Sequence, residues 1–138
     1  MVVKNLDLSL SGLRNAPVRV SSGGAYPELG CASVQLIFGN GSRLHAQYWR
    51  LIKAGKPMLS SFDHQQKYGL PAAIDAITDL QEELQDKLVT DARMREDTGD
   101  LLFEFANDFK LEVFSFTGYE DWEIQFPDNT AEYSNFVR

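Results

Sequence analysis

The chain has 138 residues, of which 43% are hydrophobic and 24% are charged, a balance typical of one globular domain. The formal net charge is −7, and seventeen of the twenty Asp and Glu residues follow Leu70, so the second half should repel nucleic acid and anionic lipid. The single cysteine, Cys31, excludes an internal disulfide and is typical of a reducing compartment. The sequence shows no signal peptide and no apolar run near the roughly 20 residues that span a membrane, so we expect one cytoplasmic domain over residues 1–138.

The first thirty residues predict little regular structure. Residues 2–10 alternate loosely between apolar and polar, which indicates an edge strand. Residues 11–31 are rich in Gly, Ser and Pro, a composition typical of a loop, and only residues 18–20 predict a short strand within it.

Two later segments look like the same β-hairpin written twice. Residues 36–44 read LIFGNGSRL and residues 103–111 read FEFANDFKL. Each has an apolar strand that ends in Phe, then a small residue, Asn, two turn positions, a basic residue and Leu. Asn-Gly and Asn-Asp accept the positive φ that a hairpin turn requires. A duplicated unit and two independent hairpins both explain the match.

Between these hairpins, residues 71–88 predict one amphipathic helix with Pro71 in its first turn. One face carries the apolar residues Leu70, Ala73, Ile74, Ile77, Leu80, Leu84 and Leu88. The opposite face carries the carboxylates of Asp75, Asp79, Glu82, Glu83 and Asp86. No Lys or Arg precedes Lys87 in this segment, so ion pairs four residues apart do not neutralise the acidic face. That face is either a solvated surface or a contact surface for a cationic protein.

Strands are expected again after the helix. A short strand near residues 89–94 lies in a charged connection that ends near residue 100, and further strands are predicted over residues 111–116 and 122–126. A turn at residues 127–129 precedes a short polar end that we expect to be partly frayed. The predicted fold is therefore α+β: an antiparallel sheet of about six or seven strands, arranged as two meanders, with one main helix packed on a face.

A second group of candidate contact residues lies at the start of the last predicted strand. Residues 119–123 combine two aromatic and three acidic side chains, a composition found at the energetic centres of interfaces. The alternative is a structural segment, with Trp122 in the core and Tyr119 capping the end of the strand. Because Trp122 alternates with Ile124, we expect Trp122 in the core and Tyr119 exposed. The partner-binding candidates here are Tyr119, Glu120, Asp121 and Glu123.

Evidence for catalysis or nucleic-acid binding is weak in this sequence. His45 and His64 are nineteen residues apart without metal-ligand spacing, and a hydrolase would need the fold to bring them and Asp63 together. Residues 43–67 carry five basic residues among aromatic ones. Such a composition is typical of segments that bind RNA. Alternatively, the basic residues pair with the acidic half of the chain, within the fold or across a dimer. We expect a protein that is not an enzyme, uses no cofactor or metal, and binds neither nucleic acid nor membrane.

Three segments carry a resemblance to a known class of proteins. Residues 99–105, 111–114 and 119–124 read GDLLFEF, LEVF and YEDWEI. They resemble a pattern common to small bacterial proteins, several of which are similar to immunity proteins of polymorphic toxin systems, including contact-dependent inhibition. The resemblance implies a cytosolic, non-enzymatic, acidic protein that blocks a cognate toxin by tight binding.

The expected function is therefore inhibition of a basic toxin, such as a nuclease with a cationic substrate groove. Its contacts would be the acidic helix face and the residues at 119–123, because carboxylates imitate phosphate and speed encounter with a cationic groove. The alternative is a self-associating structural module, a homodimer in which the basic and acidic parts of two copies meet.

Overall fold

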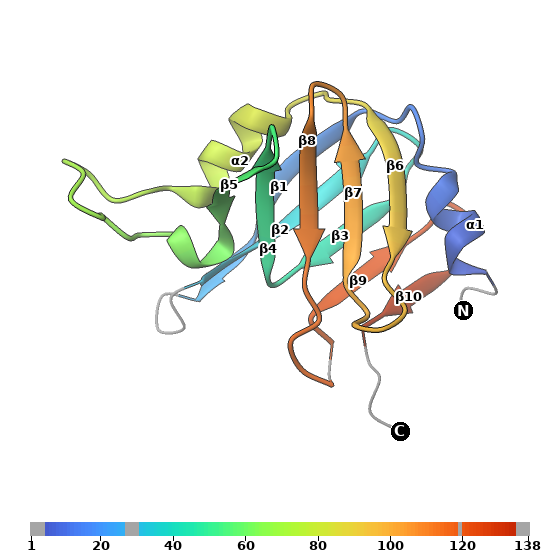
Figure 1. The fold of residues 1–138 in the computed structure, drawn as a ribbon. Coiled ribbons are helices and arrows are strands. Elements are labelled where there is room, and N and C mark those ends of the chain that lie inside the picture. Colours follow the sequence, from blue (N-terminus) through green and yellow to red (C-terminus); the bar gives the residue numbers. More distant parts are fainter. Residues whose placement is uncertain (1–4, 27–30, 119, 135–138) are drawn as a thin grey trace.

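The computed structural model describes residues 5–26, 31–118 and 120–134, which form two antiparallel sheets of five strands each (Figure 1). The first sheet contains, in spatial order, β1 (Val18–Tyr26), β2 (Cys31–Phe38), β3 (Arg43–Ala46), β9 (Trp122–Gln125) and β10 (Ala131–Tyr133). The second contains β5 (Lys56–Ser60), β4 (Trp49–Lys53), β8 (Phe109–Val113), β7 (Leu101–Phe105) and β6 (Val89–Met94). The α+β class is broadly confirmed, but the prediction of one sheet with six or seven strands is wrong.

The two sheets bury their facing sides against each other. Every second residue of a strand points to the same face, and Leu36 and Leu44 of the first sheet are fully buried, as are Phe103 and Leu111 of the second. The rings of Phe38 and Phe103 stack between the sheets, with centroids 5.6 Å apart. In Figure 1 the second sheet lies in front and the strands of the first run obliquely behind it.

The described residues also form the short helices α1 (Leu6–Ser11) and α2 (Ala76–Leu84) and the 3-10 helix η2 (Ser61–Asp63). Helix α1 packs against β6, and α2 packs against β1, so each helix lies beside an edge strand (Figure 1). No helix within the described ranges is both long and apolar enough to cross a membrane.

The two predicted hairpins are confirmed, and they have the same register. Leu36 pairs with Leu44 in β2–β3, and Phe103 pairs with Leu111 in β7–β8. One residue further along, Ile37 pairs with Arg43 just as Glu104 pairs with Lys110. The match of the two sequences is therefore also a match of the two structures.

The repetition extends far beyond the hairpins. The order helix, then five strands, occurs twice along the chain, as α1 with β1–β5 and as α2 with β6–β10. In each half the first three strands form one sheet, but the last two cross to the other sheet. Strand β4 pairs with β8, and β9 pairs with β3. The duplicated unit is thus the explanation that the structure supports, with two strands exchanged between the halves.

The two halves meet at an antiparallel bridge between Pro17 and Leu88. The backbone amide of Asn15 donates a hydrogen bond to the carbonyl oxygen of Val89, the first residue of β6 (2.8 Å). In the same way, the amide of Asp86 donates to the carbonyl oxygen of Val18, the first residue of β1 (2.9 Å). Asn15 and Asp86 both have positive φ, 67° and 57°, a conformation that Asn and Asp tolerate better than most residues. This reciprocity indicates an approximate two-fold axis through the bridge.

The prediction for the first thirty residues is wrong in two places. Within the predicted strand 2–10, the described residues form α1, which Asn5 caps by accepting a hydrogen bond from the amide of Leu8 (3.1 Å); residues 1–4 lie outside the described ranges. Within the predicted loop, β1 continues to Tyr26 because it pairs with β2 over its whole length, with one irregularity between Ser22 and Gly24. Here the hydrogen-bonded pairing with β2 outweighs a composition rich in Gly and Ser, which disfavours strands.

The main helix is shorter than its sequence pattern predicts. It begins after Asp75 and ends at Leu84, because Gln85 leaves helical geometry and Asp86 adopts positive φ to turn into β6. Leu70 and Leu88 therefore lie outside the helix and are half exposed. The strand at residues 89–94 is confirmed, and β10 forms where a frayed end was expected, although residues 135–138 lie outside the described ranges.

Candidate partner-binding surfaces

The acidic side of α2 divides into residues that have partners within the chain and residues that take part in no ion pair among the described ones. Asp75 is the N-cap, and its carboxylate accepts hydrogen bonds from the amide (3.0 Å) and the hydroxyl (2.8 Å) of Thr78. These bonds lower the pKa of Asp75 because they stabilise its charged form. Asp86 lies beyond the helix and pairs with Arg19 at 3.5 Å. Two of the five predicted contact residues thus have partners within the chain.

The other three, Asp79, Glu82 and Glu83, form what we call the acidic face. Among the described residues, none of the three takes part in an ion pair. Together with Met58 and Leu59 of β5 they line a shallow hollow of about 160 Å³. Met58 is 46% exposed, so the acidic face borders an exposed apolar side chain.

The second predicted group lies elsewhere in the fold. Tyr119 falls outside the described residues, and Glu120 is exposed. Glu123 pairs across the strands with His45 of β3. Two strands separate β9 from β1, on which α2 packs, a spacing of about 14 Å between β1 and β9 at about 4.8 Å per strand. The structure therefore does not join this group to the acidic face.

Asp121 is the candidate whose placement differs most from the expectation. Its residue is only 7% exposed. The carboxylate accepts hydrogen bonds from the amide (2.8 Å) and the hydroxyl (3.2 Å) of Thr117. Asp121 therefore stabilises the turn before β9 and is not part of the candidate binding surface.

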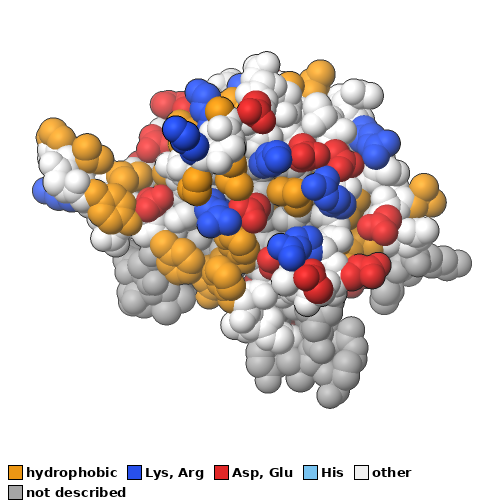
Figure 2. Space-filling model, in the orientation of Figure 1, with side chains coloured by type: hydrophobic (Ala, Val, Ile, Leu, Met, Phe, Trp, Pro, Cys, Tyr) orange, Lys and Arg blue, Asp and Glu red, His pale blue; other side chains and the backbone are white. Residues whose placement is uncertain are grey.

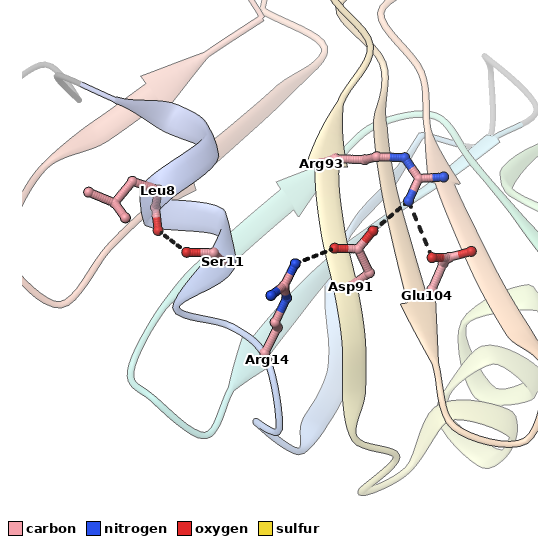
Figure 3. A network of polar contacts seen from close by, with 6 residues as sticks. All are labelled: Leu8, Ser11, Arg14, Asp91, Arg93 and Glu104. Carbon is pink, nitrogen blue, oxygen red and sulfur yellow. Dashed lines mark hydrogen bonds and ion pairs between the residues drawn. The ribbon is translucent and has the colours of Figure 1, made fainter.

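Two acids of the second half, Asp91 and Glu104, are neutralised on the outer side of the second sheet (Figure 3). Asp91 of β6 bonds Arg14 at 3.3 Å and Arg93 at 2.6 Å, and Arg93 continues to Glu104 of β7 at 3.2 Å. Lys110 of β8 reaches the same glutamate at 3.6 Å. Burial alone would raise the pKa of Asp91, but the hydrogen bonds from the two arginines lower it. This row of charges is a compensated, solvated face.

Strand exchange also pairs the basic first half with the acidic second half. Arg50 of β4 lies opposite Glu112 of β8, and its guanidinium contacts the carboxylate at 2.7 Å. Part of the basic stretch at residues 43–67 is thus satisfied within the fold, as one of the sequence interpretations expected.

Sequence reasoning missed an exposed cluster of rings at one end of the second sheet. We call it the aromatic patch; it contains Tyr48, Phe62, Phe114 and Phe116, whose contacting ring centroids lie 5.0–6.4 Å apart. Phe62 and Phe116 are 46% and 58% exposed. Figure 2 shows hydrophobic side chains gathered on one half of this side of the molecule and alternating charges on the other. The alternation along this segment puts Phe114 and Phe116 on the face opposite Leu111 and Val113, but it does not show that Tyr48 and Phe62 lie beside them.

The three residues considered for hydrolysis have separate partners. His45 lies beside Glu123 and contacts the carbonyl oxygen of Gly23 at 3.3 Å. The Nδ1 atom of His64 accepts a hydrogen bond from the amide of Ala76 (3.1 Å), whereas Asp63 accepts from the amide of Ser60 and the hydroxyl of Tyr68. In the part of the chain that the structure describes, no group of three or more His, Cys, Asp or Glu residues is arranged to hold a metal ion.

Inferences about the function of this chain rest on its exposed surfaces. No family model, no curated protein and no solved structure matches it. Among the described residues, the acidic face and the aromatic patch are two groups of neighbouring side chains that are at least partly exposed, and each is a candidate contact surface.

Proposed function

We propose that this protein is a binding protein, not an enzyme, and that it neutralises a basic toxin by docking the acidic face of α2 on the toxin's cationic groove. One observation supports this proposal above the others. The acids on the second sheet are paired with arginine or lysine, whereas Asp79, Glu82 and Glu83 have no such partner among the described residues. Their negative charge is available to an external cation.

The chemistry suits a partner that binds phosphate, such as a nuclease. Carboxylates on one helix face imitate a short run of phosphates and attract a cationic groove over several ångströms, which speeds encounter and blocks the substrate. Charge alone gives modest affinity, because exposed ion pairs are screened by salt. Met58 supplies the apolar contact that would be desolvated beside these charges.

The acidic face can be changed without touching the core. The buried side of α2 consists of Ala76, Leu80 and Leu84, and Asp79 and Glu82 are exposed on the other side. Reversing these charges should therefore leave the fold intact, since surface substitutions typically change stability by no more than about 0.5 kcal/mol.

The test is a binding and protection assay against the product of the gene immediately upstream. The test variant combines Asp79→Lys, Glu82→Lys and Glu83→Lys. A matched control combines Asp7→Lys, Glu96→Lys and Asp97→Lys, which changes the net charge equally at exposed positions away from α2. We expect the wild type and the control to bind and protect, and the test variant to do neither. A folded test variant that still protects would remove α2 from the proposal.

A further inference from the structure

We propose that the aromatic patch is the interface of a symmetric homodimer, so that its occupant is the patch of a second copy of this chain. This inference does not depend on the proposed function, because it uses another surface and another partner. It also differs from a dimer held by opposite charges, since the contact is formed mainly by rings.

The internal repeat shows that the fold does not require aromatic residues here. Phe114 donates its amide to the carbonyl oxygen of Tyr48 at 2.9 Å. At the equivalent place in the other sheet, Gln47 donates its amide to the carbonyl oxygen of Asp121, also at 2.9 Å. The same backbone pairing is thus made once with two rings and once with two polar side chains. The rings of Tyr48 and Phe114 must therefore be explained by something other than the fold.

The composition and exposure of the patch fit an interface. Phe62 and Phe116 each leave about half of their surface in water, although they contact Tyr48 at ring distances of 5.6 Å and 5.2 Å. Contiguous exposed apolar groups mark interaction surfaces, and aromatic residues are enriched at interface centres. Covering these rings removes apolar area from water at little entropic cost, because ring side chains have few rotatable bonds.

The charges beside the patch favour a second copy over a basic protein. The guanidinium of Arg50 lies 5.4 Å from the ring centre of Phe114 and binds Glu112 at 2.7 Å. Beside Phe114 the patch thus borders a cation and a carboxylate that are already paired with each other. Two copies related by a two-fold axis would place each Arg50 against the partner's Glu112, which makes the surface self-complementary. A basic toxin would instead be attracted to the unpaired carboxylates on α2.

This geometry predicts an unusual dependence on salt. Each copy carries a net charge of −7, so two copies repel each other at low ionic strength. Raising the salt from about 10 mM to about 1 M shortens the Debye length from about 30 Å to about 3 Å, which weakens that repulsion but not the contact between rings. Dimerisation should therefore tighten with salt, whereas binding of a basic protein to the acidic face should weaken.

The first experiment is sedimentation equilibrium of the purified chain at several protein concentrations and at both salt levels. We expect a monomer–dimer equilibrium that shifts toward dimer in high salt. Phe62→Ser and Phe116→Ser should each raise the dissociation constant at least about tenfold. Leu8→Ser on α1, at a position that is 70% exposed, is the matched control and should change nothing. Circular dichroism melts verify that every variant is folded.

The second experiment uses charge. Arg50→Glu and Glu112→Arg should each form a weaker homodimer, but an equimolar mixture of the two variants should form a mixed dimer, because opposite charges then face each other across the axis. A wild type that stays monomeric at millimolar concentration would overturn the proposal. So would a dimer that weakens with salt, or one that persists unchanged in both phenylalanine variants.

Discussion

Trp49 and Trp122 occupy equivalent places in the two sheets and make the same hydrogen bond. The indole Nε1 atom of Trp49 donates to the carbonyl oxygen of Ala32 at 2.9 Å, and that of Trp122 donates to the carbonyl oxygen of Gly99 at 2.9 Å. Both tryptophans are buried, and each lies in a strand that has crossed from its own half of the chain into the other sheet. Through this hydrogen bond and its burial, each tryptophan holds an exchanged strand in place.

Their equivalence predicts equal energetic roles. Trp49→Phe and Trp122→Phe each remove a buried donor and leave a carbonyl oxygen without its partner, a change that costs about 1–3 kcal/mol, and the smaller ring adds a cavity. We expect both variants to lose about 2–4 kcal/mol in free energy of unfolding, measured by urea denaturation. A large loss in one variant with none in the other would contradict the energetic equivalence of the two halves.

Strand exchange predicts that the halves depend on each other. Residues 1–69 contain β4, whose neighbour β8 lies in residues 70–138, and β9 of the second half needs β3 of the first. The cut after Gly69 falls in an exposed segment. We expect the separate pieces to lack the cooperative unfolding of the whole chain and an equimolar mixture to regain it, as followed by circular dichroism. Failure of the mixed pieces to associate would contradict this dependence.

The hydrogen bonds of Asp75 predict a dependence of stability on pH. Its pKa is lowered from 3.8 in the folded chain, chiefly by the amide and hydroxyl of Thr78. The ionised cap is therefore stabilising above the pKa of the unfolded chain, and this stabilisation is lost as pH falls through the lower pKa of the folded chain. Asp75→Ala should cost about 1 kcal/mol at pH 7 and much less at low pH. A loss that stays constant with pH would contradict this account.

The buried position of Asp121 predicts a structural role. Asp121→Ala removes the acceptor for both groups of Thr117 and should cost about 1–3 kcal/mol. Binding of a basic partner should be unchanged once the comparison is made at a temperature where the variant is folded. Thermal denaturation and a titration with that partner measure the two effects separately. Weaker binding by a fully folded variant would return Asp121 to the contact surface.

Local patterns in the sequence determined the hairpins, the burial of Leu80 and Leu84 on α2 and the inward position of Trp122. Residues 36–44 and 103–111 fold as predicted because turn chemistry and alternation act between near neighbours. Trp122 and Ile124 are buried, as their alternation indicates. The exposure of Asp79 and Glu82 also followed from helical periodicity.

Only the tertiary structure decided which strands are neighbours, and with them the surfaces. Alternation tells which residues share a face, but not which strand lies beside it. The crossing of β4 and β9 therefore could not be read from the sequence, and this crossing brings Arg50 to Glu112 and Tyr48 to Phe114. The burial of Asp121 likewise depends on the pairing of β9 with β3, beside which its carbonyl oxygen accepts a hydrogen bond from the amide of Gln47 at 2.9 Å. Contacts between residues that are distant in the chain decide which of its acidic side chains are paired, which are buried and which stay exposed.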